Sequence, residues 1–169
     1  MMINAKCYLA LALAVPGLAV AQMTPSASAP ATSANTFVEK AGASDLYEKQ
    51  SSQLVLESTK DAKIRQFANM MLKDHTKSTA DVKAAAASDR VTLPAPKLEP
   101  AQAKMVADLR TASGAARDRM YVQQQRTAHQ QALALHSGFA RSGDKPALKR
   151  AAATIAPVVQ HHMEMLQSM

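Results

Sequence analysis

The chain is short of several residue types that would point to particular classes of protein. Its 169 residues include one cysteine, five glycines, three phenylalanines, three tyrosines and no tryptophan. Because the cysteine is Cys7, disulfide bonds, thiolate metal ligands and a catalytic thiol are excluded for residues 22–169. No glycine-rich phosphate loop, paired catalytic carboxylates or nucleophile–base spacing is present, which favours a protein that is not an enzyme.

Positive charge is the main compositional bias. The formal net charge is +7 at pH 7, but the lysines and arginines are scattered along the chain. Aromatic residues make up 4% of the sequence, which leaves few rings for stacking on bases, so nucleic-acid binding is not expected. A weak attraction to anionic surfaces of the cell envelope is the partner that the charge predicts. The oligomeric state is not defined by the sequence.

The N-terminal residues have the pattern of an export signal. Lys6 precedes an apolar stretch over residues 8–20, and Ala19-Val20-Ala21 is a small-x-small cleavage site. We therefore predict a signal peptide over residues 1–21, a flexible Ser/Ala/Pro/Thr-rich linker over residues 22–35 and an exported domain over residues 36–169. The apolar stretch is too short and interrupted for a spanning helix, and no later stretch is apolar enough for a transmembrane segment.

The exported domain is predicted to be all-α. Apolar residues recur every three or four positions, and no stretch has the alternation of a strand. The expected helices cover residues 36–58, 62–90, 101–111, 115–141 and 145–169. A capping box at Thr36 to Glu39 should start the first helix, Asp144 should cap the last, and Pro157 should kink it. The result is a four-helix bundle with a short extra helix in the connection between the second and third long helices.

Three histidines fall in or near the apolar stripes of these helices. His75 continues the row Ile64, Phe67, Ala68, Met71 and Val82, and His162 continues the row of the last helix. A buried imidazole needs a partner, since an unpaired polar group costs roughly 1–3 kcal/mol. On the first helix, the row from Val38 and Ala41 leads to Asp45, Glu48 and Ser52. If that row faces inward, Glu48 is buried; the alternative is an inner face defined by Leu46 and Gln53.

Position along each helix then predicts a meeting point. Glu48, His75 and His129 lie near the midpoints of their helices and should converge, whereas His162 should lie about 8 Å off that level at 1.5 Å per residue. His136 is expected at the surface or its boundary. Asp74 is expected to cap, to pair with Lys73 or Lys77, or to brace a neighbouring helix.

Two interpretations of this centre remain open. One is a mononuclear metal site for zinc, iron or copper, with Glu48, His75, His129 and His162 as candidate ligands. The other is a hydrogen-bonded network of neutral histidines, Glu48 and Tyr121 that fixes helix register. A di-iron site is disfavoured, because the residues three before His75 and His162 are not carboxylates. The tail from His161 to Met165, with Met169, offers soft copper(I) ligands or is core filler.

The sequence resembles the domain-of-unknown-function 4142 family of exported bacterial proteins. The resemblance covers residues 36–166. It rests on the following segments, in this order along the chain: Phe67-Ala68-x-x-Met71-x-x-Asp74-His75-Thr76, Val91 to Pro94, Ala115-Ala116-x-Asp118-x-x-Tyr121-Val122, His129 with Ala132-Leu133, Gly143-Asp144 with Leu148-Lys149, and Pro157 to His162. The doubled His161-His162 and the methionine-rich end depart from the family pattern.

The resemblance implies a ferritin-like bundle in the periplasm, or associated with the outer membrane. Its matching polar positions are Glu48, Asp74, His75, Tyr121, His129 and His162. We therefore expect a periplasmic or secreted protein, cleaved near Ala21, with a polar or metal-binding His/Glu site inside the bundle and a binding or stress-related role. The alternative is a non-catalytic structural or interaction protein of the cell envelope without a metal site.

Overall fold

The structure is a computed structural model that describes residues 33–169. The signal peptide predicted over residues 1–21 and most of the predicted linker lie outside the described residues. Within residues 33–169 every regular element is a helix, which confirms the all-α class. The helices are α1 (Ala34–Leu56), α2 (Ala62–Ser88), α3 (Pro100–Thr111), α4 (Gly114–Ser142) and α5 (Pro146–Gln167). None of these helices is both long enough and apolar enough to cross a membrane.

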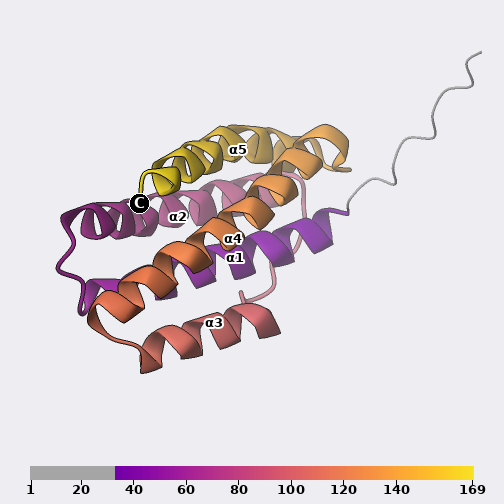
Figure 1. The fold of residues 1–169 in the computed structure, drawn as a ribbon. Helices are drawn as coiled ribbons and strands as arrows, with labels where there is room; N and C mark the ends of the chain where they lie inside the picture. The colour runs from indigo at the N-terminus through magenta and orange to yellow at the C-terminus, as the bar shows by residue number, and fades with distance from the viewer. Residues whose placement is uncertain (1–32) are drawn as a thin grey trace, which may run out of the picture.

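The four long helices form two antiparallel hairpins, α1 with α2 and α4 with α5 (Figure 1). The segment between α2 and α4 runs back along the bundle and includes α3, which lies outside against α1 and α4. A pair of hairpins joined by one long connection is the topology of ferritin-like bundles. The short extra helix therefore lies in the connection where the sequence predicts it.

The core is divided into layers along the bundle axis. One apolar cluster includes Phe37, Phe139 and Leu148, and a second includes Phe67 and Leu166. On each long helix most of the buried polar residues lie between the positions that supply these two clusters; on α4, Arg117 and His136 lie outside this stretch. The polar residues between the clusters include Asp45, Glu48, Ser51, Ser52, His75, Gln125, His129 and His162. A polar layer therefore crosses the middle of an otherwise apolar core, and such a layer is unfavourable unless its members are partnered.

Two predicted helix caps are wrong. α1 begins at Ala34 rather than Thr36, because Ser33 is the N-cap and its side chain accepts a hydrogen bond from the Thr36 amide. Asp144 does not cap α5; its carboxylate accepts from the Ala34 amide at 2.9 Å and so supports α1. The N-cap of α5 is Lys145, which is extended as expected for a residue before proline, and this leaves Asp144 outside the helix. α5 continues past Pro157 to Gln167.

The start of α5 is capped by the end of α2. Asp89 follows α2, and its two carboxylate oxygens accept from the backbone amides of Ala147 at 3.1 Å and Leu148 at 2.8 Å. These amides have no partner within their own helix, because the first turn of any helix leaves its N–H groups free. Asp89 therefore fixes how α2 and α5 meet at this end of the bundle.

Replacing Asp89 with alanine should lower the free energy of unfolding by about 1–2 kcal/mol, the usual cost of losing a helix cap. Urea denaturation of the variant and the wild type measures the change. Asp81→Ala is the matched control, since Asp81 pairs with Lys77 on the exposed face of α2, and such pairs contribute about 0–1 kcal/mol. Equal losses in the two variants would contradict the capping role.

Candidate metal centre

Three histidines from three helices meet in the polar layer. His75 comes from α2, His129 from α4 and His162 from α5, and each is at most 5% exposed. One ring nitrogen of each histidine lies within 4.8 Å of the other two. The ring centroids are 5.3 to 6.0 Å apart. Side chains far apart in the sequence therefore present nitrogen atoms to one small volume inside the bundle.

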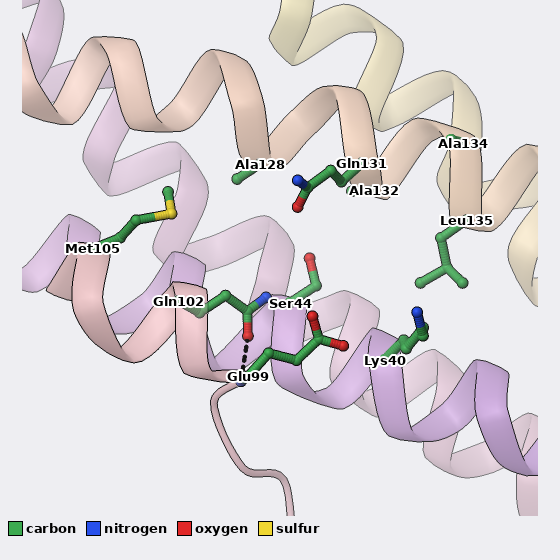
Figure 2. Close-up of a pocket in the computed structure, with 10 residues that line it drawn as sticks. All are labelled: Lys40, Ser44, Glu99, Gln102, Met105, Ala128, Gln131, Ala132, Ala134 and Leu135. Atoms are coloured by element: carbon green, nitrogen blue, oxygen red, sulfur yellow. Dashed lines mark hydrogen bonds between the residues drawn. The ribbon is translucent and has the colours of Figure 1, made fainter.

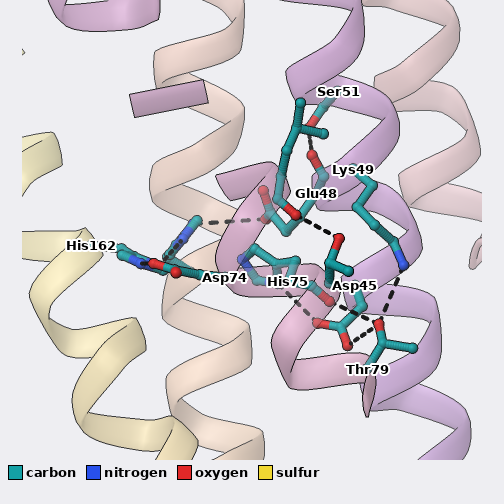
Figure 3. A network of polar contacts seen from close by, with 11 residues as sticks. Asp45, Glu48, Lys49, Ser51, Asp74, His75, Thr79 and His162 are labelled. Carbon is teal, nitrogen blue, oxygen red and sulfur yellow. Dashed lines mark hydrogen bonds and ion pairs between the residues drawn. The ribbon is translucent and has the colours of Figure 1, made fainter. Parts of the chain in front are cut away.

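The second nitrogen of each ring is held by an acceptor outside this volume, and Figure 3 labels His75 and His162 with their carboxylate acceptors. His75 Nδ1 donates to Asp45 Oδ1 at 2.8 Å, and His162 Nε2 donates to Asp74 Oδ2 at 3.0 Å. His129 Nδ1 donates to the Gln125 carbonyl at 2.9 Å. Carbonyl and ionised carboxylate oxygens only accept, so each ring must place a proton on this outer nitrogen. In a neutral ring, the inner nitrogen then carries a lone pair.

These proton positions leave the inner nitrogens without hydrogen-bond partners. His129 Nε2 and His162 Nδ1 are 3.3 Å apart, but two lone pairs cannot form a hydrogen bond with each other. His75 Nε2 has no partner. Among the described residues, no hydrogen bond satisfies these lone pairs, and a shared cation would satisfy all three nitrogens.

The donor set fits a transition-metal ion. Metal-binding histidines almost always donate their other N–H group to a carboxylate or carbonyl, as all three do here. Two ligand nitrogens of a tetrahedral centre with bonds of 2.0–2.1 Å are roughly 3.3 Å apart, and the His129 and His162 nitrogens have this separation. The outer contacts of the three imidazoles leave the inner nitrogens facing this shared volume, in which all three lie within 4.8 Å of one another.

Burial and neighbouring charges set the protonation of the three rings. Burial, with the positive charge of His75 as the next cause, lowers the pKa of His129 to about 3. Burial also lowers the pKa of His162. Burial alone would lower the pKa of His75, but its hydrogen bond to Asp45 and the charge of Glu48 outweigh it and raise the pKa. The rings of His129 and His162 are therefore uncharged at neutral pH and can offer lone pairs to a metal ion. At His75 the ion would compete with a proton.

Glu48 places a carboxylate next to this centre. It is 1% exposed, its Oε1 is 3.7 Å from His129 Nδ1, and neither oxygen has a hydrogen-bond partner. Burial raises its pKa to about 7, although the charge of His75 opposes the shift. Because Glu48 lies on the outer side of the His129 ring, it is not one of the three converging donors. It can compensate the charge of a cation held by them.

A family profile described as a domain of unknown function, DUF4142, matches residues 19–169. The chain belongs to this family. Two solved DUF305 structures share the fold. The fragment from Deinococcus radiodurans has a TM-score of 0.69 at 17% identity and covers 83% of this chain and 97% of its own. The protein from Streptomyces coelicolor, described as thought to be secreted, has a TM-score of 0.65 at 15% identity and covers 79% and 90%.

A third solved structure with this fold is CopM in the Cu(II)-bound form. Its TM-score is 0.69 at 15% identity, and the match covers 82% of this chain and 95% of CopM. The comparison with curated protein sequences gives no match. At these identities the structural neighbours establish the fold of this DUF4142 protein, and its site must be argued from its own residues.

The histidine positions correct two predictions. His162 is at the level of the other rings, not displaced from it, because the helices of a hairpin align from their shared turn: His129 and His162 are at similar distances from the turn at residues 143–145. His136 is buried, with 3% exposure, and its ring meets Phe37 edge-on at 5.4 Å between centroids. Its position two helical turns after His129 was the signal for burial.

The remaining predicted positions have distinct roles. Asp74 braces α5 through His162, which was one of its three predicted roles. Tyr121 is buried but bonds Ser52 at 2.9 Å, in the part of the polar layer that adjoins the apolar cluster of Phe67. Asp45 was missed as a functional residue, although it lies in the same helical row as Glu48 and one turn before it.

Two other features lie apart from the three histidines. In the tail, His161 is exposed and lies 3.9 Å from Glu164, while Met165 and Met169 pack partly against the core. A pocket of about 450 Å³ lies between α3, α1 and α4, which contact one another around it (Figure 2). Its lining includes Lys40 and Glu99 but none of the three histidines. In the described residues, the convergence of buried metal-binding groups is therefore found at the bundle centre, away from this pocket.

Proposed function

We propose that this DUF4142 protein binds one transition-metal ion inside its bundle through His75, His129 and His162. The observation that carries the proposal is the set of three inward nitrogens, whose rings have already donated their other N–H groups to fixed acceptors. Glu48 supplies a nearby negative charge that lowers the cost of placing a cation in an apolar core. Asp45, Asp74 and the Gln125 carbonyl orient the three rings.

Copper and zinc are the metals that suit this donor set best. Imidazole binds copper, zinc, nickel and iron, and the affinity of divalent ions for nitrogen sites peaks at Cu(II). The occurrence of Cu(II) in CopM, which has the same fold, is a second reason to test copper first. The site has no bridging carboxylates, so it does not resemble a di-iron centre.

The biological setting we propose is the cell envelope. Residues 1–21 have the pattern of a cleavable signal peptide, and the Streptomyces coelicolor neighbour is described as thought to be secreted. A metal held at a buried site, with no paired nucleophile and base beside it, suits sequestration or buffering of a metal outside the cytoplasm. A role in metal stress, without catalysis, is consistent with this arrangement.

Protein purified without an affinity tag should bind one equivalent of Cu(II) in equilibrium dialysis, and Zn(II) should compete for the same site. The electron paramagnetic resonance spectrum of the copper complex should show coupling to imidazole nitrogen. Because His75 has a raised pKa and must lose its proton, affinity should rise with pH through neutrality. Absence of stoichiometric binding to copper, zinc or iron would leave the structural or interaction role instead.

A further inference from the structure

The four seams between neighbouring long helices differ in how they are closed at the level of the histidines. Between α1 and α2, Asp45 binds His75 and accepts from Thr79 at 2.8 Å, and Lys49 donates to Thr79 at 3.2 Å. α3 covers the seam between α1 and α4, where Tyr47 donates to Gln124 at 3.1 Å. The α4–α5 seam is that of a hairpin, and Arg126 of α4 donates across it to the Leu166 carbonyl of α5 at 3.0 Å.

The seam between α2 and α5 is held at this level by a single polar contact. Among residues 33–169, these two helices are joined by the hydrogen bond from His162 to Asp74 and, far along the bundle, by the Asp89 cap. The two helices are not consecutive in the chain, so no short turn ties them together near the histidines. Asp74 is therefore the polar group of α2 that holds the His162 ring, which otherwise packs against the ring of Phe67 at 6.2 Å between centroids.

Asp74 is also the carboxylate of the centre that reaches solvent. Its side chain is 27% exposed, compared with 6% for Asp45 and 1% for Glu48. One end of the residue is therefore accessible to a hydrated cation, while its Oδ2 touches the ring of a proposed ligand. In Figure 3 Asp74 and His162 lie together, away from the Asp45 and Lys49 side of the network.

We propose that the α2–α5 seam at Asp74 and His162 is the entrance through which a divalent transition-metal cation reaches the three histidines, with Asp74 as the group that first binds the cation. This rests on the proposed metal-binding function. A carboxylate attracts a cation at long range and supplies oxygen ligands. Once Asp74 engages the cation, its hydrogen bond to His162 is released, and the ring is free to turn and carry the ion inward. Asp74 then accepts again from His162 Nε2.

Stopped-flow mixing with Cu(II), followed by the visible absorbance of the complex, tests this entrance. Asp74→Asn keeps the shape and a hydrogen-bond acceptor but removes the charge. It should lower the association rate constant about tenfold at low salt and weaken the dependence of that constant on salt. Asp74→Glu should retain the wild-type rate within about twofold, since it preserves the charge.

Asp81→Asn is the matched control, because it removes a carboxylate from the same helix that pairs with Lys77 at the surface, away from the three rings. It should leave both the association and the dissociation rate constants unchanged. An unchanged association rate in Asp74→Asn, or equal slowing in both asparagine variants, would overturn the entrance. Equilibrium dialysis of the wild type separates the two hypotheses: if no ion binds, the proposed function fails, whereas binding with no effect of Asp74 on rate refutes the entrance alone.

Discussion

Replacing His129 with leucine is expected to weaken Cu(II) binding at least 100-fold and to leave the metal-free protein as stable as the wild type or more stable. The affinity falls because one of three ligand nitrogens is lost, and even the outer partners of such ligands commonly contribute 10–100-fold. The stability is retained, because in the wild type the neutral His129 ring places a lone pair 3.3 Å from that of His162, and the substitution removes this unfavourable contact. Leucine has a similar volume and buries no polar atom.

A loss of copper affinity without a loss of stability distinguishes a metal site from a hydrogen-bonded network that fixes helix register. If the histidines only fix helix register, removing one ring breaks the network and the free energy of unfolding must fall. Competition titrations give the affinity, and thermal unfolding without metal gives the stability. His136→Leu is the control, since His136 is a buried histidine on the same helix outside the three-nitrogen group. Normal metal affinity in His129→Leu, combined with lower stability, would refute the metal site.

Glu48→Gln is expected to stabilise the metal-free protein by about 1–3 kcal/mol at pH 8 and to have little effect near pH 4. Burial raises the pKa of Glu48 from 4.5 to about 7 in the folded protein. Between these two values the folded state holds a proton that the unfolded state has lost, so the stability associated with Glu48 declines as pH rises from about 4.5 to 7. Each unit of pKa difference corresponds to about 1.36 kcal/mol.

Urea denaturation across this pH range measures the effect of Glu48→Gln. Glu39→Gln, which changes an exposed carboxylate on the same helix, should shift the unfolding free energy by less than about 0.5 kcal/mol. The copper affinity should respond in the opposite direction, because the variant lacks the charge that compensates a bound cation. A variant that is less stable than the wild type at pH 8 would show that the Glu48 carboxylate is well partnered in the folded state.

Helix periodicity predicts the fold and the inward direction of two of the histidines. The three- and four-residue spacing on α2 and α5 placed His75 and His162 on buried faces, whereas the row through Ala41 left two orientations of the first helix open, of which the structure has the one that buries Glu48. These predictions succeed because a helix fixes the angle between successive side chains. They concern one helix at a time and require no knowledge of how helices pack.

Two errors lie within single helices, at the start of α1 and at the buried His136, and the others involve relations between elements. The position of His162 along the bundle axis depends on the turn that joins α4 to α5. Comparing each histidine with the midpoint of its own helix takes no account of that turn. Asp144 binds the Ala34 amide instead of capping α5, and Asp89 caps α5 in its place, because each carboxylate accepts from backbone amides of a helix distant in sequence. The role of Asp45 required the position of α2 beside α1. The directions of the ring protons, on which the metal argument rests, likewise come from contacts between helices as well as from the Gln125 carbonyl.

The three nitrogen donors come from three helices, and neighbouring donors in the sequence are separated by at least 33 residues. An unfolded chain therefore contains no short stretch that could chelate an ion with this set of rings. The proposed metal ion could therefore bind only after α2, α4 and α5 have packed against one another. The amount of bound metal would then report the fraction of chains that have folded, and a misfolded chain would bind no ion at this site even where the ion is abundant.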